Sequence, residues 1–250
     1  MLLGLRLFMT PLLIAAATLV GRKWGPGVSG WLIGFPLTSG PVSIILALQY
    51  GPNFAAQTAI GNLGGIISIC AFNLIYCTVA GYGNWLISAV TAGLSFLIVT
   101  AMLNSFTLLL LPTFFCALTA VALTLKLIPK RALNTAAQQA PRWDLPARMI
   151  VAATFVIILT GIAPLLGPQL SGLIVLFPIY GTVLASFALR QQGAIAARNL
   201  LRGMTISLFG VAGFFLIVGG LLPHGEIGWT YALAIVVVAV INGVTFRFTR

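Results

Sequence analysis

Apolar segments long enough to cross a lipid bilayer follow one another along almost the whole chain. Of its 250 residues, 60% are hydrophobic and only 6% are charged, whereas a soluble domain carries about 25% charged residues. A transmembrane helix needs about 20 mainly apolar residues, because each residue adds about 1.5 Å across a hydrocarbon core of roughly 30 Å. The sequence therefore predicts an all-α integral membrane protein with several spanning helices.

Polar, Gly and Pro residues divide this apolar sequence into about nine predicted transmembrane helices. The stretch from 85 to 127 is too long for one span, so we place a break at Asn104. The longest polar stretch, 126–148, is predicted to be the one sizeable loop. The nine helices are expected at residues 3–20, 29–48, 54–79, 85–103, 106–127, 147–166, 171–189, 200–222 and 229–246.

The basic residues predict how these helices are oriented. With nine spans and the N-terminus outside, only Arg6 of the 13 Lys and Arg residues lies on the outer side. Cytoplasmic loops are enriched in Lys and Arg, so this distribution favours an outer N-terminus and a cytoplasmic C-terminus. Eight spans would divide the basic residues between the two sides. The predicted cytoplasmic set is Arg22, Lys23, Lys126, Lys130, Arg131, Arg142, Arg148, Arg190, Arg198, Arg202, Arg247 and Arg250.

A self-match indicates an internal duplication. Residues 25–51, GPGVSGWLIGFPLTSGPVSIILALQYG, align without gaps to residues 167–193, GPQLSGLIVLFPIYGTVLASFALRQQG, at an offset of 142 positions. Eight of the 27 positions are identical. A match of this length in one register predicts two copies of one structural unit. The register continues through Ala55/Ala197, Gly61/Gly203 and Phe72/Phe214.

The two copies are predicted to cross the membrane in opposite directions. Each supplies four helices, and the helix at 106–127 adds one crossing between them. The predicted organisation is a first repeat over 1–104, a linker helix with a basic cytoplasmic loop over 105–146, and an inverted second repeat over 147–250. Inverted repeats are typical of secondary transporters, whose substrate site lies near the midplane where the repeats meet. A duplication retained only for stability is the alternative.

Gly and Pro interrupt the second helix of each repeat around a shared Phe-Pro pair. Broken helices at membrane depth persist only where they are buried in protein or line a wet cavity, and paired breaks in two repeats point to a transport site. Hydroxyl and amide side chains nearby could contact a solute. The candidate substrate-binding residues are Phe35, Pro36, Thr38, Ser39, Gly40, Ser43, Gln57, Asn62, Phe177, Pro178, Tyr180, Gly181 and Thr182.

Two simpler interpretations of these residues remain open at this point. The prolines could produce ordinary kinks whose neighbouring hydroxyls bond back to the helix. Gln57 and Asn62 could hydrogen-bond between helices, which contributes about 1 kcal/mol per bond in a membrane protein.

Several classes of function are poorly supported by the sequence. The two acidic residues, Asp144 and Glu226, lie outside the predicted spans, which disfavours a proton or sodium relay built on buried carboxylates. No catalytic constellation, metal cluster or phosphate loop is visible, so we expect neither an enzyme nor a resident metal or cofactor. The basic residues are scattered between apolar segments, which argues against a nucleic-acid partner.

The second half resembles the GlpM-type small inner-membrane proteins, a bacterial family of four spans. The resemblance is carried by SGLIVLFPIYGTVLAS and LLRGMTISLFGVAGFFL, with the Phe-Pro pair as its specific part, and it is fainter in the first half. It implies a fused, inverted duplication of that unit in the bacterial inner membrane, but it implies no substrate.

Together these features predict a membrane transporter or permease for a small uncharged or anionic solute. A channel on the same scaffold and a lipid-handling or membrane-assembly protein are the alternatives. The expected partners are the solute and membrane lipids, and the sequence leaves association into a homodimer open.

Overall fold

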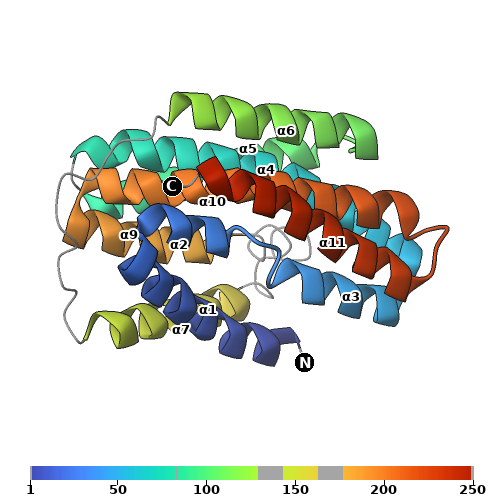
Figure 1. Cartoon of the computed structure of the whole chain (residues 1–250), viewed down its shortest axis with the longest axis horizontal. Helices are drawn as coiled ribbons and strands as arrows, with labels where there is room; N and C mark the ends of the chain where they lie inside the picture. The colour runs from blue at the N-terminus through green and yellow to red at the C-terminus, as the bar shows by residue number, and fades with distance from the viewer. Residues whose placement is uncertain (1, 83, 129–142, 163–176, 249–250) are drawn as a thin grey trace.

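The computed structural model describes residues 2–82, 84–128, 143–162 and 177–248, and every regular element in these ranges is a helix (Figure 1). Two short 3₁₀ turns follow α4 and α11, at Ala80–Tyr82 and Phe246–Phe248. The α-helices are α1 (Leu2–Trp24), α2 (Pro26–Ile33), α3 (Ser39–Tyr50), α4 (Pro52–Val79), α5 (Trp85–Asn104), α6 (Leu110–Leu127), α7 (Asp144–Ile162), α9 (Ile179–Gln192), α10 (Ala194–Leu221) and α11 (Ile227–Thr245).

Five helices within the described residues are long and apolar enough to cross a membrane: α4 with its 3₁₀ extension, α5, α6, α10 and α11. Their mean hydropathy lies between 1.8 and 2.2. The protein is therefore an all-α protein with several candidate membrane spans. The count of nine stays a prediction, and parts of the predicted spans 147–166 and 171–189 fall outside the described residues.

Three predicted helices differ from those observed by an interruption or by more than four residues at one end. In the span expected at 171–189, Phe177 and Pro178 are not helical and α9 begins at Ile179. The span expected at 29–48 is two short helices, because α2 ends at Ile33 and α3 begins at Ser39, on either side of Pro36. The helix expected to begin at 200 begins at Ala194, so Arg198 lies within α10 instead of before it. Its 28 residues extend for about 42 Å at 1.5 Å per residue. This exceeds the bilayer core of roughly 30 Å, so the basic first turns can project beyond it.

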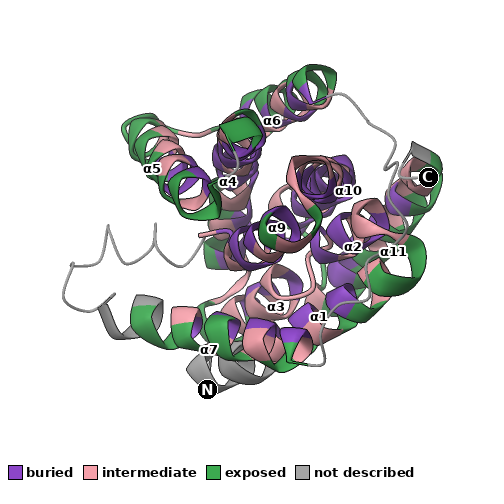
Figure 2. Ribbon diagram, turned by 90° about the vertical axis from the view of Figure 1, so that its left-hand side faces the viewer, coloured by how far each residue is buried: buried purple, intermediate pink, exposed green. Residues whose placement is uncertain are grey.

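The two longest helices, α4 and α10, pack together in antiparallel directions. Asn73 Nδ2 of α4 donates to Thr205 Oγ1 of α10 at 2.9 Å. The Arg198 guanidinium near the start of α10 bonds to the Cys77 carbonyl near the end of α4 at 2.8 Å. Seen along the bundle, α10 lies at the centre, while α5, α6, α7 and α11 lie at the periphery with their exposed residues outward (Figure 2). The outer helices therefore present the surface expected to face lipid.

A tight turn at a glycine joins α3 to α4, and a second one joins α9 to α10. Gly51 and Gly193 have φ angles of 90° and 87°, with ψ near 180°, a backbone region that is essentially restricted to glycine. Both turns are followed by a helix of 28 residues. Helix α4 begins at Pro52 and α10 begins at Ala194, 142 positions later. Gly193 likewise follows Gly51 by 142 positions.

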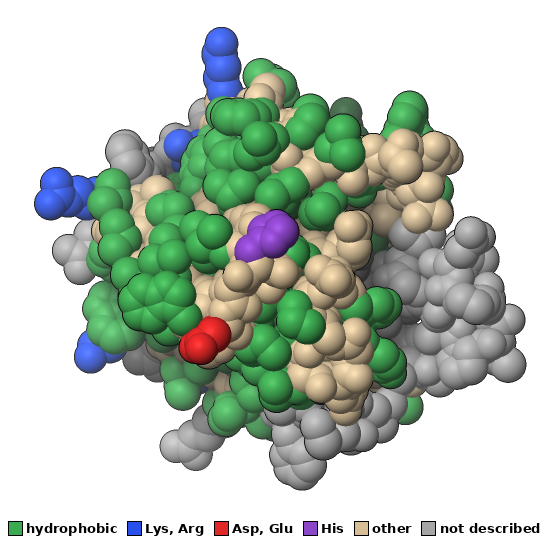
Figure 3. Space-filling model, turned by 90° about the vertical axis from the view of Figure 1, so that its right-hand side faces the viewer, with side chains coloured by type: hydrophobic (Ala, Val, Ile, Leu, Met, Phe, Trp, Pro, Cys, Tyr) green, Lys and Arg blue, Asp and Glu red, His purple; other side chains and the backbone are tan. Residues whose placement is uncertain are grey.

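Basic side chains gather at one end of the bundle. Helix ends meet there, since Arg22 at the end of α1 contacts Asp144 at the start of α7, and Arg202 of α10 bonds to the Leu125 carbonyl in the last turn of α6. The α10–α11 turn, with His224 and Glu226, lies at the other end. Figure 3 faces that end, where hydrophobic side chains dominate and Lys and Arg are visible only at the margin. In the described residues, basic side chains are thus concentrated at one end of the bundle and scarce at the other.

Candidate functional site

Pro36 interrupts the backbone hydrogen bonding between α2 and α3. It has no N–H group to donate, and Leu37 N–H turns back to the Phe35 carbonyl at 2.8 Å. Regular bonding resumes at Gly40 N–H, which reaches the Pro36 carbonyl at 2.8 Å. The polar backbone freed at this break borders a cavity.

The cavity at this break has a volume of about 480 Å³ and is lined by residues from seven helices and from both Phe-Pro segments. It lies between α3 and α9 and against the middle of α4 and α10. The described residues that line it are Thr10, Leu13, Ile33, Gly34, Phe35, Pro36, Leu37, Thr38, Ser39, Val42, Ser43, Leu46, Thr58, Gly61, Asn62, Gly65, Ile66, Ile69, Val156, Phe177, Pro178, Ile179, Tyr180, Met204, Leu208, Val211 and Phe215.

Nine of the thirteen candidate residues line this cavity, although binding of a solute to them stays a prediction. They come from α4 and from the two Phe-Pro segments, which lie 142 positions apart in the sequence. The nine are Phe35, Pro36, Thr38, Ser39, Ser43, Asn62, Phe177, Pro178 and Tyr180.

The other four candidates lie away from the cavity lining. Gln57 is exposed, because it stands one position before Thr58 and is turned by about 100° around α4. Gly40 faces the Phe214 ring and Gly181 faces Met204 Sδ. The Thr182 hydroxyl donates to the Pro178 carbonyl at 2.9 Å within its own helix.

A stripe along α4 is the part of the lining that the sequence prediction largely missed. Its members repeat at intervals of three and four residues, which places them on one face of a helix. Only Asn62 was selected from this face, yet the periodic signal was available in the sequence. The stripe consists of Thr58, Gly61, Asn62, Gly65, Ile66 and Ile69.

Most hydroxyl groups around the cavity already have hydrogen-bond partners. Thr10 Oγ1 and the Tyr180 hydroxyl lie 3.3 Å apart. Ser43 Oγ and the Tyr231 hydroxyl lie 2.7 Å apart, and Thr58 donates to the Phe54 carbonyl at 2.9 Å. These groups stabilise the cavity wall, and a solute would have to displace an existing partner to use them fully.

Three polar side chains of the lining have no hydrogen bond among the described residues: Thr38, Ser39 and Asn62. All three are partly exposed within the cavity and not fully buried, so water can solvate them when the cavity is empty. They are the groups that are free to contact a solute.

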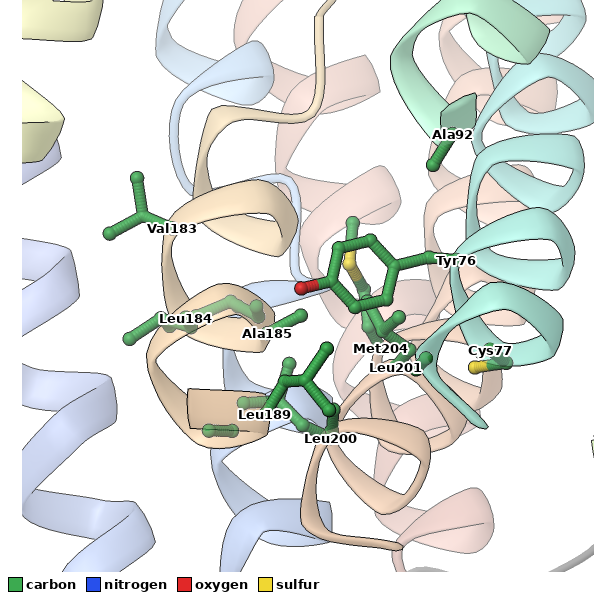
Figure 4. Close-up of a cluster of buried hydrophobic side chains, with 14 of the residues drawn as sticks. Tyr76, Cys77, Ala92, Val183, Leu184, Ala185, Leu189, Leu200, Leu201 and Met204 are labelled. Carbon is green, nitrogen blue, oxygen red and sulfur yellow. The ribbon is translucent and has the colours of Figure 1, made fainter. Parts of the chain in front are cut away.

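Toward the basic end, packed side chains close the space beyond the cavity. Phe72, Tyr76 and Leu201 have no exposed surface and belong to one core shared by α4, α9 and α10. Figure 4 shows Tyr76 extending from α4 toward α9 and Met204, which itself lines the cavity. The Tyr76 hydroxyl donates to Ser186 Oγ at 3.1 Å. In the described residues, the side chains that follow the cavity lining along α4 toward the basic end therefore belong to a fully buried core.

A polar network at the basic end centres on Asp144, which begins α7 and has no exposed surface. The sequence placed Asp144 in the predicted loop at 126–148. In the structure, Asp144 Oδ1 accepts from Arg148 Nε at 2.8 Å and from Gln191 Nε2 at 2.6 Å. Burial raises the pKa of Asp144, but hydrogen bonds from Arg148, Gln191 and Arg22 outweigh it, so the pKa is lowered. The carboxylate is therefore ionised at neutral pH.

Comparisons of the chain with protein-family models, curated protein sequences and solved structures found no match. The resemblance to GlpM-type proteins therefore stays an expectation from sequence. Within the described ranges, no group of three or more His, Cys, Asp or Glu side chains is arranged to hold a metal ion.

Proposed function

We propose that this protein is a membrane transporter that moves a small solute through the cavity at its two Phe-Pro breaks. The observation that carries the proposal is that Pro36 and Pro178, 142 positions apart, border one cavity of about 480 Å³. Site volumes of about 300–1,000 Å³ are usual for small molecules. Broken helices that meet inside a bundle are the common position of transporter sites.

Two inverted repeats would explain how the breaks come together. The packing of α4 against α10 supports this arrangement. Arg198 contacts the Cys77 carbonyl, and a methyl group on Gly219 would lie 3.8 Å from the Ala56 carbonyl oxygen. At the repeat offset of 142 positions, Arg198 is equivalent to Ala56, and Cys77 is equivalent to Gly219. Each contact is therefore the counterpart of the other, as a two-fold axis between antiparallel repeats requires.

Charge supports the proposed orientation, in which the basic end of the bundle faces the cytoplasm of a bacterial cell. Arg22, Arg148, Arg198 and Arg202 all make contacts at this end. Positive-inside selection would retain Lys and Arg on that side. The cavity reaches Leu46 and Thr58, close to the Gly51 turn at the opposite end, and would then be accessible from outside.

A carrier accounts for the packed side chains between the cavity and the basic end better than a channel does. A channel in its open state needs a continuous path, whereas Phe72, Tyr76 and Leu201 fill the space beyond the cavity. A lipid-handling role would use the basic end to bind head groups. However, Arg198 and Arg202 already bond to backbone carbonyls of Cys77 and Leu125, which leaves them less free for that role.

The proposal is tested by flux measurements on the full chain in proteoliposomes. Osmotic swelling, followed by light scattering, reports entry of unlabelled neutral solutes such as polyols, amides and ureas. A carrier should give protein-dependent entry that saturates with concentration and is slowed by Thr38→Val. Entry that rises linearly without saturation would indicate a channel, and no protein-dependent entry of any neutral or anionic solute would contradict transport.

A further inference from the structure

We infer that the solute is an uncharged molecule with an apolar body and one hydrogen-bonding end. This inference rests on the proposed function and narrows its solute class, which on the sequence alone included anions. It follows from the chemistry of the cavity wall: its charge, the position of its free polar groups, and the rings that surround the remaining space.

No charged side chain lines the cavity in the described residues. A charged solute moved from water to an apolar site costs several kcal/mol unless an opposite charge or a metal compensates it. At the basic end of the bundle, Arg22 and Arg148 both pair with Asp144, and none of these three side chains lines the cavity. A neutral solute meets no such penalty.

The free polar groups are positioned at one level of the cavity. Ser39 lies 12 positions before the Gly51 turn and Asn62 lies 11 positions after it, and helices α3 and α4 pack against each other from that turn. At equal rise per residue, the two side chains reach the same depth, about 17 Å from the turn. Thr38 stands next to Ser39 at the break. This level combines amide and hydroxyl groups, which can both donate to and accept from a neutral polar group.

Apolar side chains, including the rings of three phenylalanines, surround the rest of the space. Phe35, Phe177 and Phe215 line the cavity. The Phe177 ring is held by edge contacts with Phe72 and Phe96, whose ring centroids lie 6.2 and 5.8 Å away. Rings fixed in this way offer a preformed apolar surface, which favours a flat or aliphatic body over a fully hydroxylated one.

Binding of three probes with one body and different head groups tests the inference. Benzamide, benzoate and benzylammonium share a ring and differ in charge. Binding is measured by saturation-transfer NMR on the full chain in nanodiscs, with empty nanodiscs as the control for partition into lipid. The variants are Asn62→Leu, which removes the free amide, and Gln57→Leu, which changes an exposed amide on the same helix outside the cavity.

We expect benzamide to bind the wild-type protein and the Gln57→Leu variant equally. Binding to Asn62→Leu should weaken by about fivefold, the loss expected for one neutral hydrogen bond. The two ions should show no signal above empty nanodiscs. Binding of benzoate or benzylammonium as strong as that of benzamide, absent benzamide binding, or an unchanged Asn62→Leu variant would each overturn the inference.

The binding test and the flux test can fail separately. Benzamide binding with the expected pattern, without flux of any solute, would refute transport but leave the ligand class of the cavity standing. Saturable flux restricted to charged solutes would support transport and refute the uncharged class.

Discussion

The guanidinium of Arg22 donates to the carboxylate of Asp144 at 3.0 Å between Nη2 and Oδ2, and so joins α1 to α7 across 122 positions of sequence. Arg148 and Gln191 occupy the other carboxylate oxygen. One buried acid thus connects α1, α7 and α9 at the end of the bundle where basic side chains gather.

Replacing this acid should destabilise the protein strongly. Asp144→Ala leaves the buried Arg148 guanidinium without its ionic partner, and breaking a buried pair on one side costs about 3–5 kcal/mol. Thermal unfolding in detergent measures the effect. Glu226→Ala removes an exposed acid and should leave the melting temperature nearly unchanged. Equal effects of the two substitutions would contradict the role of Asp144 as the centre of the network.

The same network predicts how stability depends on pH. The pKa of Asp144 is lowered in the folded protein, so its contribution is complete above the unfolded pKa of about 3.9 and is lost as pH falls through the folded value. The difference in melting temperature between wild type and Asp144→Asn should stay constant from pH 7 to 5 and shrink below about pH 4. A difference that changes between pH 7 and 5 would show instead that burial dominates and the pKa is raised.

Two glycines at equivalent positions should respond differently to the same substitution. A methyl group on Gly203 would lie 1.9 Å from the Gly27 carbonyl oxygen, because α2 and α10 pack closely there. Gly203→Ala should therefore destabilise the protein by about 1–3 kcal/mol. Gly61, 142 positions earlier, has no neighbour within 4 Å of such a methyl group, so Gly61→Ala should fold with normal stability. A stable Gly203→Ala variant would contradict the close α2–α10 contact.

Reporter fusions test the proposed orientation. A reporter that is active only in the cytoplasm should be active when fused between α6 and α7, and inactive when fused at the N-terminus. Twelve of the 13 basic residues would then lie on the cytoplasmic side, as positive-inside insertion requires. A loop exposed outside would refute both the orientation and the argument from charge for inverted repeats.

Helix positions were predictable from the sequence where Gly, Pro and polar residues interrupt strong hydrophobicity. The predicted helices at 54–79 and 85–103 differ from α4 and α5 by at most two residues at each end. In the span predicted at 171–189, Phe177 and Pro178 are not helical and α9 begins at Ile179. The start of α10 was wrong by six residues: Arg198 suggested a loop, but its guanidinium group bonds to the Cys77 carbonyl of α4. A local charge pattern contains no information about such tertiary partners.

The candidate-site residues at the helix breaks were predictable from the sequence, whereas the residues on the cavity walls were less so. The Phe-Pro segments identified Phe35, Pro36, Phe177 and Pro178, which line the cavity. Composition alone could not separate Gln57 from Asn62, because both are amides on one helix and only the direction of each side chain distinguishes them. Asp144 was placed in a loop because acids are expected in water, whereas three donors compensate its burial.

The central claim, that a solute passes through the cavity at the two breaks, is tested most directly by solute flux through a matched pair of variants. Asn62→Leu and Gln57→Leu make the same chemical change on α4, and only Asn62 lines the cavity. In osmotic swelling assays on proteoliposomes with equal protein content, Asn62→Leu should reduce saturable entry of a neutral solute by at least about fivefold, while Gln57→Leu should match the wild type. Equal flux through both variants would contradict passage of the solute through this cavity.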